Sequence, residues 1–294
     1  MVRRLVVGAA VIVLLWLSAT VVAGLFGGDD SRTIEAVAPT TNTFITDGSP
    51  TTQPAPTTTE PPPKEITVPS AADPAEVLIL GDSDAGTFGP YLKTLLDETG
   101  MVTTELDYKV SSGLSRPDFF DWPTHMRQVV PQANPDIVVV TFGGNDAQAI
   151  SNADGSWAIE YVPASGSRDD EWKVLYAARV AEVMDYLSAD NRTLIWVGIP
   201  NDDNPDVTAR MQVQDEVVRT EAAKRPDVVF IDTWNRFVGP SGGWAEFLVD
   251  PRDGVGKDVR ADDGFHLNEN GAEILALDIA DAVSSELRAR GADI

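Results

Sequence analysis

The sequence contains no cysteine and only two histidines, His125 and His266. The absence of cysteine excludes disulfides, thiolate nucleophiles and zinc sites built on cysteine, although it does not identify the redox compartment. The scarcity of histidine is more informative, because a mechanism that needs an imidazole base near neutral pH must use one of these two residues.

Basic residues are also scarce. The chain has 22 lysines and arginines against 46 aspartates and glutamates, which gives a formal net charge of -24. A field of this sign repels the phosphate backbone of nucleic acids and anionic lipid head groups. We therefore expect no nucleic-acid partner.

Charged side chains are absent from residues 5–26, and Arg3 and Arg4 come directly before this stretch. A transmembrane helix needs about 20 apolar residues, whereas the apolar part of a signal peptide has only about 7–15. Since basic residues stay on the cytoplasmic side, the segment predicts a single-pass anchor in the cell membrane, with the rest of the chain outside the cytoplasm. Small residues at 21–24 leave signal cleavage, and hence secretion, as the alternative.

Composition divides the chain into three segments. Residues 1–28 form the predicted membrane anchor or signal segment. Residues 29–73 are rich in threonine and proline and have neither helical nor strand periodicity, which predicts a disordered stalk. Residues 74–294 are expected to form one catalytic domain, because this length allows a single full-sized core.

From residue 76 onward, short apolar runs alternate with amphipathic stretches, which is typical of an α/β fold. Apolar runs without strict polar alternation suit a parallel sheet that is covered on both faces. Residues 157–170 are rich in serine, glycine and aspartate and predict an excursion on the surface. The expected strands are 77–80, 104–110, 137–142, 193–198 and 228–231, and the expected helices are 91–98, 124–130, 171–188, 207–223 and 270–290.

A candidate nucleophile directly follows the first predicted strand. Asp82 and Ser83 come after Gly81, on a tight turn at the carboxyl end of the strand. Ligands bind at this end of the strands in an open α/β sheet, so Ser83 is well placed to react with one. A serine in this position can also simply cap the next helix, and the other motifs must decide between the two.

A candidate base lies near the other end of the chain. His266 follows Asp263 by three residues, just before the last predicted helix. An imidazole that takes a serine proton needs a carboxylate to fix its tautomer and to stabilise the imidazolium, and Asp263 can supply it. The pair can also be read as turn and helix-start residues. His125 lies in a helical stretch and reads as a surface or packing residue.

Two further residues are candidate donors to an oxyanion. Asn145 follows the third predicted strand, in the run Gly-Gly-Asn-Asp at 143–146, and its side-chain N–H suits this task. Gly113 follows the second predicted strand and can supply a backbone N–H. Glycine after a strand usually marks only a turn, so the specific signal is the order of these motifs after successive strands.

In this order, the motifs resemble the four blocks of the SGNH or GDSL hydrolase superfamily, and the resemblance covers residues 77–287. It implies a flavodoxin-like three-layer α/β fold with a parallel sheet of about five strands. It implies no cofactor and no metal ion. The roles that it implies are Ser83 as nucleophile, His266 as base, Asp263 as the residue that orients it, and the N–H groups of Ser83 and Gly113 with the Asn145 side chain as the oxyanion hole.

The segment SGLSRPDFFDWP at 112–123 is similar to one in an exported bacterial subgroup of this superfamily. Its aromatic residues Phe119, Phe120 and Trp122 read equally well as the lining of a cleft and as core. Asp84 departs from the superfamily pattern, which usually has an apolar residue after the nucleophile. A carboxylate at this position disfavours a nearby oxyanion if it points inward.

These features predict a serine esterase that removes acyl groups, such as acetyl, from cell-envelope glycans or related acylated molecules through an acyl-serine intermediate. One alternative is an O-acyltransferase that passes the acyl group to a glycan hydroxyl. Another is a glycan-binding module with an inactive site. The third is a magnesium-dependent phosphatase that uses Asp82 and Asp84, with Asp262 and Asp263 completing an acidic metal site.

Overall fold

The computed structural model describes residues 64–164 and 168–294. The predicted membrane anchor and most of the predicted stalk lie outside these described residues. Within the two described ranges, no helix has both the length and the apolar character that crossing a membrane requires.

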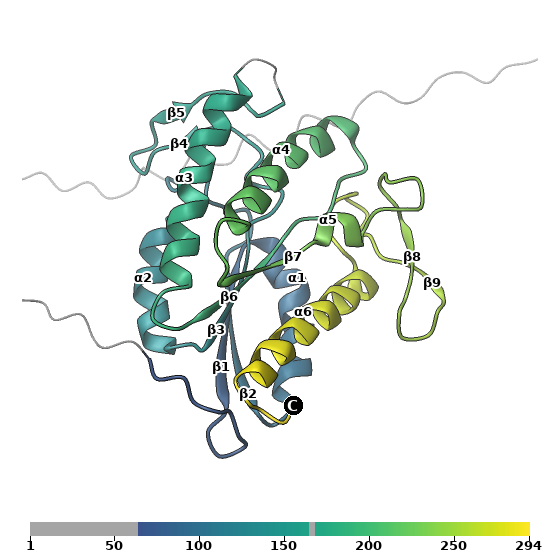
Figure 1. The fold of residues 1–294 in the computed structure, drawn as a ribbon. Helices are drawn as coiled ribbons and strands as arrows, with labels where there is room; N and C mark the ends of the chain where they lie inside the picture. The colour runs from purple at the N-terminus through teal and green to yellow at the C-terminus, as the bar shows by residue number, and fades with distance from the viewer. Residues whose placement is uncertain (1–63, 165–167) are drawn as a thin grey trace, which may run out of the picture. The chain divides into compact units, whose positions relative to one another are not determined.

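Helices and strands alternate as the sequence predicts (Figure 1). The main elements are β1 (Ala75–Gly81), α1 (Ser83–Asp97), β2 (Val102–Tyr108), α2 (Trp122–Ala133), β3 (Ile137–Thr141), α3 (Asp169–Leu187), β6 (Thr193–Val197), α4 (Pro205–Ala222), β7 (Val228–Ile231) and α6 (Glu269–Ala289). The sequence did not predict the short elements β4 (Ile150–Ser151), β5 (Trp157–Ile159), α5 (Thr233–Arg236), β8 (Phe247–Val249) and β9 (Gly256–Asp258).

Five strands form one parallel sheet in the order β2-β1-β3-β6-β7. β2 lies on one side of β1, and the next strand, β3, lies on the other side of β1. This is the flavodoxin-like order. In such sheets, ligands bind at the carboxyl ends of the strands, beside the two strands (here β1 and β3) between which the strand order reverses. The structure confirms the predicted fold class.

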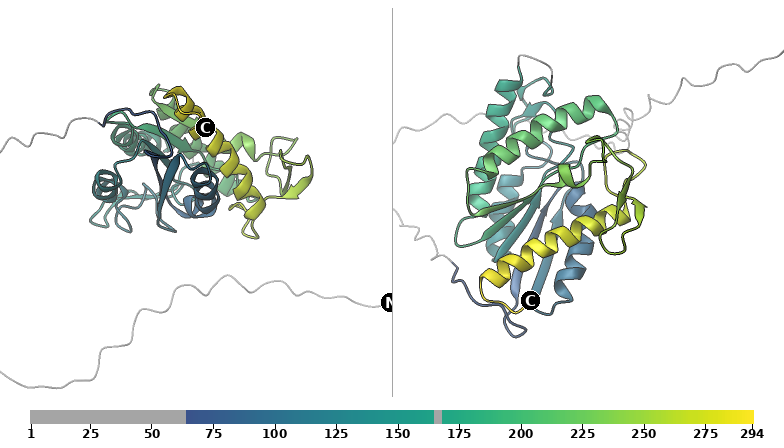
Figure 2. Two further views of the ribbon diagram at one scale, coloured as in Figure 1. Left: turned by 90° about the horizontal axis from the view of Figure 1, so that it is seen from below. Right: turned by 45° about the vertical axis from the view of Figure 1, so that its right-hand side comes forward.

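Helices cover both faces of the sheet (Figure 2). Leu78 and Leu80 of β1 belong to a core cluster with α2, α3 and α4, whereas Val77 and Ile79 belong to a cluster with α1 and α6. Because side chains alternate between the two faces of a strand, a strand buried on both faces needs an unbroken apolar run. This explains why the sequence of β1 lacks polar alternation.

Helix α1 begins at Ser83, eight residues before the predicted start at residue 91. Glycine and proline, which are found at 86, 89 and 90, are unfavourable inside a helix. However, the side chain of Asp82 accepts a hydrogen bond from the backbone N–H of Asp84 at 3.0 Å and caps the first turn. The early start places the nucleophile candidate on the helix itself rather than in a flexible turn.

The aromatic segment after β2 is divided between core and surface. Trp122 is fully buried and donates its indole N–H to Ser112 Oγ at 2.8 Å, and Phe120 packs against the same core. Phe119 lies on the surface with 51% of its area exposed. The core interpretation is therefore right for Trp122 and wrong for Phe119.

We expect Gly81→Ala to lower the free energy of unfolding by about 2–5 kcal/mol, measured by urea denaturation. Gly81 has a φ of +149°, and a Cβ there would lie 2.2 Å from the carbonyl oxygen of Thr141 on the neighbouring strand. Gly155→Ala is the matched control, because Gly155 also has a positive φ of +84° but has open space around it. Equal losses in both variants would show that the close approach of β1 and β3 is unimportant.

Candidate active site

Ser83 lies at the carboxyl end of β1 as the first residue of α1. Its Oγ is 2.9 Å from Nε2 of His266, although the two residues are 183 positions apart in the sequence. The first backbone N–H groups of a helix have no partner inside it, and they carry the positive end of the helix dipole. The start of α1 therefore places both a hydroxyl and a free backbone donor at one point.

His266 and Asp263 form a close pair. Nδ1 of His266 is 2.6 Å from Oδ2 of Asp263, whose Oδ1 accepts the backbone N–H groups of Phe265 and His266 at 3.1 and 3.0 Å. Partial burial works against ionisation, but these hydrogen bonds outweigh it and lower the pKa of Asp263. An ionised carboxylate can only accept, so Nδ1 donates to it, which leaves Nε2 to accept the Ser83 hydroxyl.

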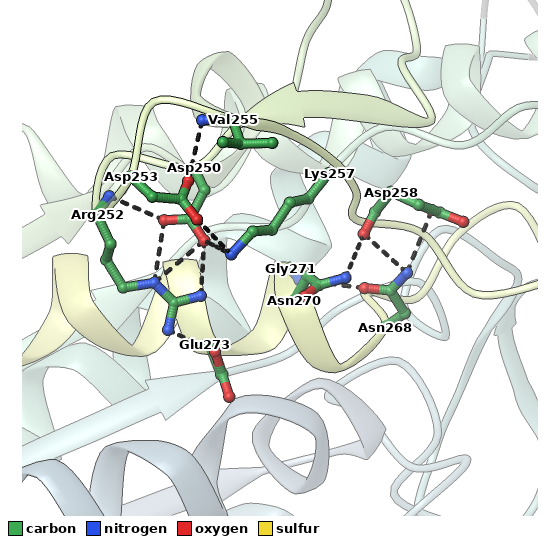
Figure 3. A network of polar contacts seen from close by, with 10 residues as sticks. All are labelled: Asp250, Arg252, Asp253, Val255, Lys257, Asp258, Asn268, Asn270, Gly271 and Glu273. Carbon is green, nitrogen blue, oxygen red and sulfur yellow. Dashed lines mark hydrogen bonds and ion pairs between the residues drawn. The ribbon is translucent and has the colours of Figure 1, made fainter.

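The turn that carries His266 is fixed where it enters α6. Asn268 caps this helix by accepting the backbone N–H of Gly271 at 3.2 Å, and its amide donates to the backbone oxygens of Asp258 and Arg260 at 3.1 and 3.0 Å (Figure 3). The buried Arg260 guanidinium in turn donates to the backbone oxygen of Phe265 at 3.0 Å. Hydrogen bonds therefore fix both Phe265, directly before His266, and Asn268, two residues after it.

A second set of bonds joins the β8–β9 hairpin to α6. The buried carboxylate of Asp250, next to the end of β8, accepts from Arg252 and Lys257, each at 2.7 Å (Figure 3). Arg252 also pairs with Glu273 on α6. The hairpin thus braces the helix that follows the histidine turn.

The loop that carries Asn145 is tied to the nucleophile turn. Oδ2 of Asp82 accepts the backbone N–H of Gly143 at 2.7 Å, in addition to capping α1 through Oδ1. Asn145 is half-buried, and its backbone oxygen accepts from the side chain of Gln148. The loop is therefore positioned through backbone contacts, and no hydrogen bond to the side-chain amide of Asn145 occurs among the described residues.

Asp146 joins the loop of Asn145 to the loop of Gly113. Its buried carboxylate accepts the backbone N–H groups of Leu114 and Ser115 at 2.9 and 2.8 Å, and a Cβ at Gly113 would lie 2.1 Å from it. Only glycine fits so close to this carboxylate. The sequence interpretation included Asp146 in its motif but missed this role, because nothing local shows that two loops meet there.

Asp84 points inward rather than to solvent. It is buried beside a cavity of about 10 Å³ that Phe88, Leu267 and Leu275 also line, and its Oδ2 has no hydrogen-bond partner among the described residues. Burial, followed by the neighbouring carboxyl groups of Asp82 and Asp263, raises its pKa well above the usual range. The surroundings of Asp84 therefore favour its neutral form.

Burial also raises the pKa of Asp82, to about 7, although the two backbone donors that it accepts work in the opposite direction. Of the two buried carboxyl groups, Asp82 has the hydrogen bonds that favour the charged form and Asp84 does not. When only one of these two carboxyl groups is ionised, it is therefore that of Asp82.

The second histidine lies away from Ser83 and has its own partner. Nε2 of His125 is 2.6 Å from Oδ2 of Asp107, and its ring packs edge-on against Phe120 and Trp122. This arrangement agrees with a packing role. Of the two histidines, the structure brings only His266 within hydrogen-bond distance of Ser83.

The acidic residues near Ser83 do not assemble a metal site. Within residues 64–164 and 168–294, no three side chains of His, Cys, Asp or Glu type are grouped so that they could hold a metal ion. Both carboxylate oxygens of Asp82 already accept backbone N–H groups, and Asp84 is buried among apolar side chains. This geometry argues against the phosphatase alternative.

Comparisons with known proteins agree with the fold. A family model described as "Protein of unknown function (DUF459)" matches residues 76–282, and no curated protein matches the sequence. A lipase/acylhydrolase from Enterococcus faecalis has a similar structure, with a TM-score of 0.52 and 17% identity over 72% of this chain and 96% of that one. A GDSL-like lipase from Bacteroides thetaiotaomicron gives 0.50 and 14% over 72% and 89%. These likenesses show that the chain shares the fold of these proteins.

We expect Asp84→Asn to flatten the dependence of stability on pH. Because the native pKa of Asp84 is raised, there is a range of pH above about 4 in which the native state holds a proton on Asp84 that the unfolded chain has already released, since a free aspartate ionises near pH 4. A raised native pKa means that stability falls as pH rises, by up to about 1.4 kcal/mol per pH unit for one proton. Urea denaturation at a series of pH values measures this slope.

Asp154→Asn is the control for this experiment. Asp154 is exposed on a turn and its pKa is lowered by hydrogen bonds from Ser156, so it is ionised in both states above pH 5. Its loss should leave the slope unchanged. If Asp84→Asn also kept the wild-type slope, Asp84 would not be protonated in the native state.

Proposed function

The chain belongs to the family described as "Protein of unknown function (DUF459)", and on this premise we propose that it is a serine esterase that hydrolyses ester-linked acyl groups. The main support for this proposal is that hydrogen bonds join the side chains of three residues. Ser83 contacts His266 at 2.9 Å, and His266 contacts Asp263 at 2.6 Å. A serine becomes a nucleophile when a base accepts its proton and a third group orients that base.

The first half of the reaction forms an acyl-serine. His266 Nε2 takes the hydroxyl proton while Ser83 Oγ bonds to the carbonyl carbon of the ester, and the carbonyl oxygen becomes an oxyanion. Asp263 stabilises the imidazolium that this step creates. The carbon–oxygen bond to the leaving alcohol then breaks, and His266 returns the proton to that alcohol.

Three donors are proposed to stabilise the oxyanion. They are the backbone N–H of Ser83 at the start of α1, the backbone N–H of Gly113 and the side-chain amide of Asn145. The Asp82–Gly143 and Asp146–Leu114 hydrogen bonds support this assignment, because they hold the donor loops in fixed positions beside the nucleophile turn. Donors that are fixed before the reaction stabilise the developing charge without reorganisation.

The second half releases the acyl group. Water takes the place of the alcohol, gives a proton to His266 and attacks the acyl carbon. Collapse of the second oxyanion then breaks the bond between the acyl carbon and Ser83 Oγ, and His266 returns the proton to Oγ as the carboxylic acid leaves. The raised pKa of Asp84 supports activity, because the neutral form that it favours does not repel an oxyanion near the site.

The proposed substrate is an acylated glycan of the cell envelope, with acetyl as the expected acyl group. The predicted anchor at residues 1–28 and stalk at residues 29–73 would hold the domain outside the cytoplasm, close to such glycans. A series of p-nitrophenyl esters from acetyl to long acyl chains tests the acyl preference directly. Preference for long chains would point to lipid instead.

We expect Ser83→Ala to abolish hydrolysis of p-nitrophenyl acetate, because the substitution removes the atom that bonds to the acyl group. Ser156→Ala, at an exposed turn, is the control and should retain activity. Activity of the unmodified protein should persist in EDTA. Loss of activity in EDTA, or full activity in Ser83→Ala, would exclude the proposed mechanism.

Asn145→Ala should lower kcat by about 10²–10³ if the amide donates to the oxyanion, with little change in KM. Steady-state kinetics with p-nitrophenyl acetate measures both constants. Asn152→Ala removes an amide from the surface turn between β4 and β5 and should leave both unchanged. A loss in Asn145→Ala smaller than about tenfold would remove Asn145 from the oxyanion hole.

A further inference from the structure

Two exposed aromatic rings lie on segments that connect to the catalytic edge of the sheet. Phe119 has 51% of its surface exposed and Trp157 has 47%. A basic side chain lies over each ring: Lys109 Nζ is 5.8 Å from the centre of Phe119, and Arg116 Cζ is 5.2 Å from the centre of Trp157. We call these four residues the aromatic rim.

The aromatic rim is connected to the nucleophile turn through its backbone. Lys109 donates its backbone N–H to the backbone oxygen of Gly81 at 2.9 Å, two residues before Ser83. Farther along the same loop, Ser115 donates its backbone N–H to Asp146, which neighbours Asn145. The loop therefore runs from the nucleophile side of the site to the oxyanion side, with Phe119 just beyond it.

The rim is held in place before any ligand binds. Arg116 makes two hydrogen bonds of 2.8 Å to Asp118, and Ser151 of β4 donates to the same carboxylate. The backbone N–H of Ser151 also donates to the backbone oxygen of Ser115 at 3.0 Å, which joins the loop to the β4–β5 hairpin that carries Trp157. A preformed surface loses less entropy on binding than a mobile one.

Packing does not explain why these rings are aromatic. Trp122, three residues after Phe119, is fully buried in the core, whereas Phe119 leaves half of its surface in water. Exposed aromatic groups on segments that are hydrogen-bonded to the nucleophile turn and to the loop of Asn145 can form part of a ligand site. The rim therefore has the character of a ligand surface.

The chemistry of the rim suits sugars better than an acyl chain. An acyl chain needs a continuous apolar lining, but here the two rings alternate with the charged groups of Lys109, Arg116 and Asp118. A pyranose presents C–H groups on its face, which pack on the electron-rich face of an aromatic ring, and hydroxyls on its edge, which bond to polar side chains.

We propose that the aromatic rim is a glycan subsite, at which Trp157 and Phe119 stack on sugar units of the substrate while its ester lies at Ser83. The inference rests on the proposed esterase activity and specifies its substrate as an acylated oligosaccharide. Lys109 and Arg116 position the rings and donate to sugar hydroxyls.

The test compares two acetyl esters with the full-length chain. Trp157→Ala and Phe119→Ala should each raise KM for O-acetylated cellotetraose about three- to tenfold, while the kinetics with p-nitrophenyl acetate change less than about twofold. Trp157→Phe should restore much of the affinity, because a ring is kept. Val174→Ala is the control and should leave the kinetics with both esters unchanged, because Val174 is 73% exposed on α3.

The outcomes separate the subsite from the enzyme activity. Equal losses with both esters would indicate a structural role for the rings, and no loss with either ester would show that they bind nothing; both results overturn the subsite. Cleavage of p-nitrophenyl acetate without cleavage of the acetylated oligosaccharide overturns the subsite but leaves the esterase. If the unmodified chain cleaves neither ester, the proposed function fails and the subsite fails with it.

Discussion

The carboxyl group of Asp82 makes the interaction on which the rest of the site depends. One oxygen accepts the backbone N–H of Asp84 and starts α1 at the nucleophile, and the other accepts the backbone N–H of Gly143 and holds the loop of Asn145. Asp82 has no exposed surface, so its loss would leave two donors unpaired away from water, at a cost of about 1–3 kcal/mol each. A single side chain thus fixes the nucleophile turn against the loop of the proposed oxyanion donor.

Environment gives the carboxyl groups around Ser83 different charges. Asp263 accepts a ring N–H and two backbone N–H groups, which lower its pKa and keep it charged beside His266. Asp84 is buried near apolar side chains and other carboxyl groups, which raise its pKa. The charge that the proposed mechanism needs lies on Asp263, beside His266, whereas the surroundings of Asp84 favour its neutral form. Two residues of one type therefore take opposite roles, as their surroundings dictate.

The sequence predicted the layers and the main strands, because apolar runs without polar alternation require a sheet covered on both faces. It also singled out Ser83, Asp263 and His266, which the structure brings together. It did not predict the start of α1, because glycines and a proline at 86–90 obscured the cap formed by Asp82. Nor did it predict the short hairpins, whose few residues carry little periodicity. Contacts between distant loops have no local signature in a single sequence.

The central claim is that Ser83 forms a covalent bond to an acyl group with His266 as its base. Mass spectrometry of the folded chain after reaction with a fluorophosphonate probe tests this claim most directly, because the probe bonds only to an activated serine. We expect one adduct per chain, on the peptide that contains Ser83, and no adduct after the chain is unfolded. A folded chain that stays unmodified, or an adduct on another serine, would contradict it.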